Sequence, residues 1–156
     1  MKTKQLQTHW WDWLSTSERL LRVLHEQTAA LTLRDVARVE RIQPDLDGLL
    51  YKMKEIDDNA AACAKTLADE LGSEPNLRSL VTALEKAEAQ QVQQIANRVK
   101  VAAQHVEGVM TKNRALIESE LTYVNGTLTL IAKAAAEAKG PYEKAGHGAV
   151  LLDQAA

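Results

Sequence analysis

The chain has 156 residues, which is near the size of one domain, and it contains one cysteine. Its net charge is −2 at pH 7, so it lacks the basic excess of proteins that bind nucleic acid or anionic membranes. Hydrophobic residues make up 46% of it, many of them alanine, and aromatic residues only 4%, which favours closely packed helices. It has no apolar run of about 18 residues and no signal-peptide pattern, so we expect a cytoplasmic protein without membrane insertion.

The first predicted helix covers residues 4–31, where apolar side chains recur at helical spacing. Trp11 points away from this apolar stripe, and packing at the end of a bundle is favoured for it over contact with a ligand. Thr32, followed three residues later by an acid, is typical of a helix start and predicts a short helix over residues 35–42. Pro44 is expected to end that helix, because the residue before a proline is disfavoured in helical geometry.

A long helix is then predicted over residues 44–71, with Pro44 in its first turn. Cys63 lies on its apolar face and is interpreted as a small packing residue, not as a reactive thiol. Gly72 is well placed to end this helix, and Ser73 to cap the next one.

The longest helical pattern covers residues 85–138. A short helical piece, residues 76–83, precedes it, and the sequence leaves open whether this piece runs straight into the long helix or bends near Glu85. Asn125-Gly126 is typical of a turn, but the apolar phase passes through it unbroken, so a continuous helix is favoured. One polar residue, Asn113, interrupts an apolar face that must lie against other helices. The apolar members are Val92, Ile95, Val99, Ala102, Val106, Val109, Leu116, Ile117, Leu121, Val124, Leu128 and Ile131.

Three long helical elements, two short ones and no strand signal predict an all-α fold, either an elongated antiparallel helical bundle or a coiled hairpin with a long C-terminal helix. We expect one domain over residues 1–140. Gly140-Pro141 stops the last helix, and residues 141–156 are expected to form a mobile tail.

Residues capable of catalysis or metal binding are scattered along the chain. The four histidines, His9, His25, His105 and His147, form no zinc-binding pattern, and no phosphate-binding loop or nucleophile elbow is present. The basic residues are interleaved with acids. The sequence therefore predicts no enzyme, no cofactor, no metal site and no nucleic-acid partner.

From Asn113 onward the chain reads Asn-x-x-Leu-Ile, with Tyr123 one to two turns later and a Tyr-x-x-x-Gly tail from Tyr142 to Gly146. This combination resembles the FlgN family of flagellar type III export chaperones. The detailed resemblance covers about the last third of the chain. Gly126, inside the helix that carries the motif, departs from the family pattern.

The resemblance implies a cytosolic chaperone that binds the C-terminal segments of hook-associated (hook-filament junction) proteins, prevents their premature assembly and delivers them to the flagellar export gate. It implies no hydrolysis and no cofactor. Tyr123 is a candidate for contact with either the subunit or the export gate. The residues that the resemblance assigns to partner contact are Asn113, Leu116, Ile117, Leu121, Tyr123, Val124, Leu128 and Ile131.

Other interpretations of the same apolar face stay open. It could be ordinary bundle core, covered by the tail or by a second copy of the chain in a homodimer. A structural coiled-coil scaffold that self-oligomerises is the alternative function. A helical sensor would need a buried polar cluster, and Asn113 alone is more typical of a residue that fixes helix register.

Overall fold

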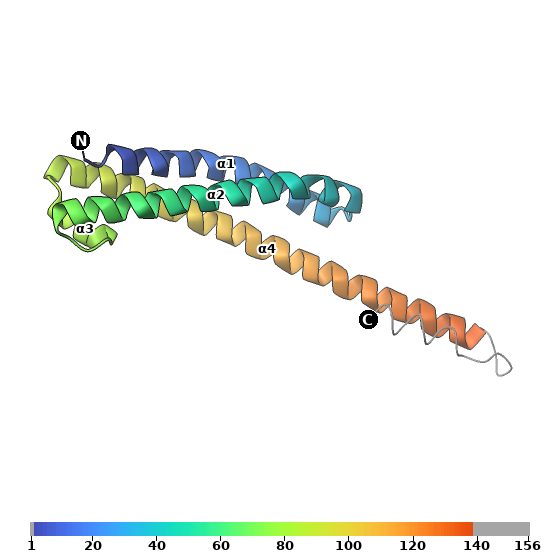
Figure 1. Ribbon diagram of the computed structural model, residues 1–156. Coiled ribbons are helices and arrows are strands. Elements are labelled where there is room, and N and C mark those ends of the chain that lie inside the picture. Colours follow the sequence, from blue (N-terminus) through green and yellow to red (C-terminus); the bar gives the residue numbers. More distant parts are fainter. Residues whose placement is uncertain (1, 139–156) are drawn as a thin grey trace. The chain divides into compact units, whose positions relative to one another are not determined.

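The computed structural model describes residues 2–138, which form four α-helices and no strand. The helices are α1 (Lys4–Thr32), α2 (Val36–Leu71), α3 (Leu77–Ala83) and α4 (Lys86–Ala138) (Figure 1). The prediction of an all-α fold with a long last helix is confirmed. The chain divides into two units, residues 1–114 and 115–156, and α4 contributes to both. The predicted tail, residues 141–156, lies outside the described residues.

In the first unit, α1 and α2 lie side by side and are joined by a tight turn (Figure 1). Arg34 adopts a left-handed conformation with φ of 55°, and the Asp35 N–H donates to the Ala30 carbonyl at 2.9 Å, which closes the end of α1. The predicted cap at Thr32 is wrong. Thr32 still belongs to α1, because buried Ala30 and Leu31 hold the last turn in the core, and Asp35 caps α2 instead.

The predicted helix end before Pro44 is also wrong, since α2 passes through this residue. A proline inside a helix costs about 3 kcal/mol, because it removes one backbone hydrogen bond and crowds the preceding turn. Ile42 and Leu46 flank Pro44 and are 7% and 5% exposed, and burying such side chains contributes about 1.5–3 kcal/mol each. Pro44 itself is exposed. The backbone carbonyl four residues earlier, which receives no N–H from the proline, can therefore bind water. Packing thus outweighs the local signal.

Gly72 ends α2 in a left-handed conformation, as predicted. The cap of α3 is Asn76, whose side chain accepts from the Ser79 N–H at 2.8 Å, and not the predicted Ser73. Pro75 explains the difference, because it disfavours helical geometry in the residue before it. Between α3 and α4 the backbone is extended at Leu84, so these helices are separate.

The core of the first unit has two parts. At one end, Leu80 of α3 joins Leu6 of α1 and residues from the last turns of α2. In the larger part, the residues that α1, α2 and α4 contribute are Trp13, Leu20, Leu24, Leu46, Leu49, Met53, Ile56 and Val106. The N-terminal half of α4 therefore packs against two helices at once.

Candidate functional site

The apolar face of α4 is buried in the first unit and exposed in the second. Before residue 115, Val92, Ile95 and Val106 are buried. After it, Leu121 is 59% exposed and Ile131 is 60% exposed, although the helical spacing of apolar residues continues. Leaving such side chains in water forgoes about 1.5–3 kcal/mol each. A contiguous apolar face of this kind marks an interaction site more often than an accident of composition.

Asn113 lies at the end of the buried part of this face. Its side-chain amide donates to the Leu24 carbonyl and to the Gln27 side-chain oxygen, both at 2.9 Å. Its oxygen accepts from the Thr28 hydroxyl. Asn113 is only 2% exposed, and its hydrogen-bonding groups are used within the first unit. Contact between Asn113 and a partner stays a prediction, whereas the role in fixing helix register has a structural basis.

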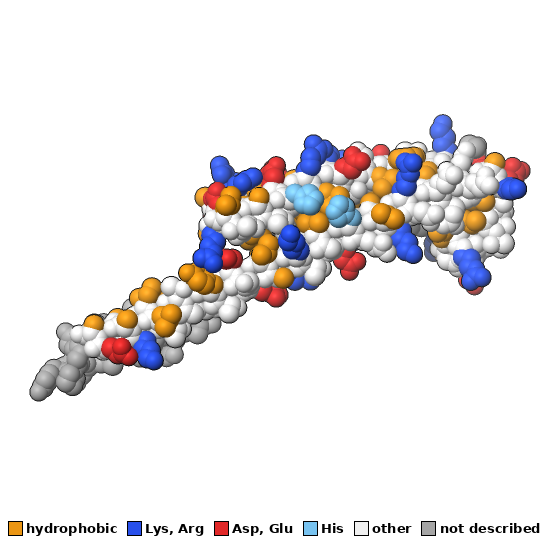
Figure 2. Space-filling model, turned by 180° about the vertical axis from the view of Figure 1, so that it is seen from behind, with side chains coloured by type: hydrophobic (Ala, Val, Ile, Leu, Met, Phe, Trp, Pro, Cys, Tyr) orange, Lys and Arg blue, Asp and Glu red, His pale blue; other side chains and the backbone are white. Residues whose placement is uncertain are grey.

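The exposed residues of the second unit form a regular seam, which we call the α4 seam. Its spacing is four, three, four and three residues, which keeps the side chains on one side of a helix. All five members are predicted contact residues, and all are exposed. They are Ile117, Leu121, Val124, Leu128 and Ile131. Figure 2 shows hydrophobic side chains reaching the surface of this C-terminal segment.

A second apolar row accompanies the α4 seam. Leu116, Tyr123 and Leu130 follow one another at intervals of seven residues, and we call them the flanking column. At about 100° per residue this column lies about 120° around the helix from the centre of the seam. Leu116 is half-buried, Tyr123 is 54% exposed and Leu130 is 69% exposed. Leu130 was missing from the predicted contact residues, although its seven-residue distance from Tyr123 is visible in the sequence.

The helix that carries these residues is continuous, as predicted. α4 runs through Asn125 and Gly126 without a break. A Cβ atom on Gly126 would meet nothing within 4 Å, so no close contact among the described residues requires glycine there. The departure from the family pattern therefore does not interrupt the contact helix.

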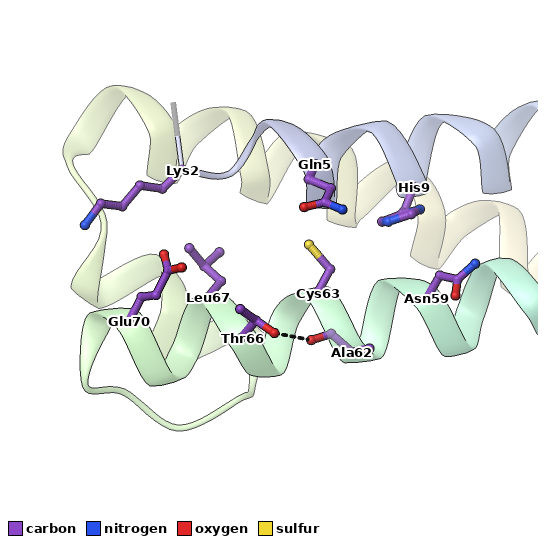
Figure 3. Close-up of a pocket in the computed structure, with 9 residues that line it drawn as sticks. All are labelled: Lys2, Gln5, His9, Asn59, Ala62, Cys63, Thr66, Leu67 and Glu70. Atoms are coloured by element: carbon purple, nitrogen blue, oxygen red, sulfur yellow. Dashed lines mark hydrogen bonds between the residues drawn. The ribbon is translucent and has the colours of Figure 1, made fainter.

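The clefts of the first unit are lined by few side chains that could act in catalysis. One of about 390 Å³ lies between α1 and α2, with His9 on one wall and Cys63 and Glu70 on the other (Figure 3). Burial, and then the nearby Glu70 carboxylate, raise the pKa of the Cys63 thiol, which keeps it protonated at neutral pH. Cys63 is half-buried, and its protonated state agrees with its interpretation as a packing residue.

A second cleft, of about 410 Å³, lies between α1 and α4 and is lined mainly by apolar atoms. Near it the Arg98 guanidinium lies over the Trp11 ring at 5.5 Å, which covers part of a tryptophan that is 47% exposed. His25 and His105 lie next to each other on the surface, with ring centroids 6.2 Å apart. Within residues 2–138 no group of three or more histidine, cysteine or acidic side chains could hold a metal ion.

None of the helices in the described part of the chain combines the length and hydropathy that crossing a membrane requires. In the comparison with known protein families, residues 1–148 match the family described as FlgN protein. No curated protein and no solved structure matches the chain.

Proposed function

Because this chain belongs to the FlgN family, we propose that it holds the C-terminal segments of hook-associated (hook-filament junction) proteins in the cytosol, prevents their premature assembly and delivers them to the flagellar export gate. In general terms the family is one of flagellar export chaperones, which are binding proteins and not enzymes. The identity of the guest, the binding of its C-terminal segment and its delivery to the export gate are the parts that we propose.

The exposure of the α4 seam is the observation that supports this proposal. An export chaperone must present an apolar surface to a subunit that is not yet folded. The seam offers five aliphatic side chains in a helical row, all exposed. We propose that they contact the guest together with Asn113, Leu116 and Tyr123, and that Tyr123 is also a candidate for contact with the export gate.

The physics of such a contact suits temporary binding. A disordered subunit end that becomes an amphipathic helix on the seam buries apolar surface but loses conformational entropy. The ordering cost, about 2–5 kcal/mol or more, keeps the net affinity moderate. The guest can therefore leave at the export apparatus without ATP hydrolysis by the chaperone.

The test replaces Leu121 and Leu128 together by serine. Both side chains are exposed, so the free energy of unfolding should change by less than about 0.5 kcal/mol per site. If each leucine is buried by the guest, the pair contributes about 3–6 kcal/mol, and affinity for junction-protein C-terminal segments should fall at least about 100-fold in calorimetry. The matched control, Thr122→Gln with Thr129→Gln, changes two exposed positions with the same seven-residue spacing, away from both the α4 seam and the flanking column. A folded serine variant that binds with full affinity would rule out this site.

A scaffold that self-oligomerises is the second candidate, and the same exposed seam favours it. The two functions differ in stoichiometry. A chaperone should form a defined complex with its client, whereas a scaffold should assemble, as a homodimer or larger, without one. Sedimentation of the protein with and without a junction subunit distinguishes them.

A further inference from the structure

Resting on the proposed function, we propose that the guest covers the α4 seam with two helices and not with one. The guest then completes a small helical bundle in which α4 contributes one member. Three observations on α4 carry this inference: a change of register after Asn113, the distribution of branched side chains along the seam, and the way the preceding part of the same helix is packed.

The register of α4 changes at the boundary between the two units. From Val92 to Asn113 the apolar steps alternate between three and four residues, which is a heptad pattern. After Asn113 come two successive steps of four, to Ile117 and Leu121. One step of four stands where the heptad has a step of three, so the later pattern is displaced by one residue from the earlier heptads. The exposed seam therefore has its own heptad register, although it stays on the same face of α4.

Within that register the two heptad core positions differ in side-chain shape. Leu121 and Leu128 occupy the first position, a, and are unbranched at Cβ. Ile117, Val124 and Ile131 occupy the fourth position, d, and are all β-branched. Pairs of parallel helices prefer the reverse, with β-branched residues at a and leucine at d. Leucine at a with isoleucine at d favours bundles of three or four helices. The seam therefore has the pattern of a helix that contacts more than one neighbour.

The contact of α4 with α1 and α2 in the first unit shows how two helices can cover its apolar face. In the first unit the apolar face of α4 is covered by two helices, with Leu20 and Leu24 from α1 and Met53 and Ile56 from α2 in one core with Val106. The α4 seam continues the same helix beyond this interface. A guest that supplies a helical pair would repeat, on the second unit, the arrangement that the chain builds for itself on the first.

The first experiment measures the helix formed on binding. The seam, residues 117–131, is about 21 Å long at 1.5 Å per residue, so each guest helix that covers it contains about 15 residues. Circular dichroism of the full-length chain, titrated with a purified junction-protein C-terminal segment, should show a gain of about 30 helical residues per one-to-one complex. A gain of about 15 would overturn the proposal, as would assembly of the chain alone into trimers or tetramers through the seam.

The second experiment exchanges the two kinds of side chain. Leu121→Ile and Leu128→Ile, combined with Ile117→Leu, Val124→Leu and Ile131→Leu, add only one methylene group in total but give the pattern of a parallel two-helix coiled coil. Affinity for the same segment should fall at least about tenfold, with unchanged helicity of the free chain. The control, Val124→Ile with Leu128→Met, preserves the pattern and should stay within about twofold.

The two proposals fail in different ways. If the serine pair at Leu121 and Leu128 leaves binding intact, the seam is not the guest site and both proposals fall. If the serine pair abolishes binding while the exchanged variant binds normally, the guest occupies the seam but not as a helical pair.

Discussion

At the scale of single residues, Asn113 is the side chain that sets how α4 sits against α1. An apolar face alone defines this poorly, because its members resemble one another and a helix could slide by a turn. Asn113 prevents this, since its amide meets the Leu24 carbonyl and the Gln27 side chain, and the Thr28 hydroxyl completes the network. Among the described residues, no buried side-chain nitrogen or oxygen lacks a partner. A polar residue that is fully satisfied in one register penalises all others.

Asn113→Ala should therefore destabilise the first unit. The substitution removes the donor to the buried Gln27 side-chain oxygen and one of the two acceptors of the half-buried Thr28 hydroxyl, which keeps its bond to the Leu24 carbonyl, and the expected loss in the free energy of unfolding is about 2 kcal/mol. Urea unfolding measures it. The control is Asn125→Ala, an exposed position on the same helix, where a change below about 0.5 kcal/mol is expected. Equal effects at the two positions would show that the network contributes nothing to stability.

At the scale of helices, the local preferences of single residues compete with the burial of apolar side chains. Helix ends that follow local preference could be predicted from the sequence, and those decided by burial could not. Gly72 as a helix end and the continuity of α4 through Gly126 follow from backbone freedom and apolar phase, which are visible in the sequence. The continuation of α2 through Pro44 could not be predicted in this way, because it depends on the burial of Ile42 and Leu46 against other helices. The same limit applies to the site. The apolar spacing is similar before and after Asn113, so periodicity alone could not show that only the later part is exposed.

Two glycines, one inside α2 and one just after its last residue, illustrate this competition and should respond oppositely to alanine. Gly48 lies inside α2, where an added Cβ would meet nothing within 4 Å, so Gly48→Ala should stabilise the protein by about 0.5–1 kcal/mol. Gly72 has φ of +65°, which strains any residue with a Cβ, so Gly72→Ala should destabilise it by about 1 kcal/mol. Thermal unfolding of both variants checks the signs. A stabilising effect of Gly72→Ala would contradict the assignment of Gly72 as the left-handed end of α2.

At the scale of the whole molecule, the buried side chains and the proposed guest site belong to different parts of the chain. Every residue that is buried among those described belongs to the first unit, with Asn113 as the last of them. The described residues of the second unit, 115–138, contribute exposed apolar side chains instead. Changes in guest affinity can therefore arise in the second unit without unfolding the first. Such a division suits a protein that must bind and release without losing its own structure.

Ending the chain after residue 119 tests this division directly. The cut retains Asn113 with more than a turn of helix beyond it and removes all of the α4 seam except Ile117. Because the buried side chains stay in place, the midpoint of thermal unfolding should shift by less than about 4 °C, which corresponds to less than about 1 kcal/mol in a domain of this size. Capture of junction-protein C-terminal segments should be lost, as in the full-length chain with serine at Leu121 and Leu128. A large drop in the unfolding midpoint would show that residues beyond 119 support the first unit, and retained capture would place the guest site before residue 120.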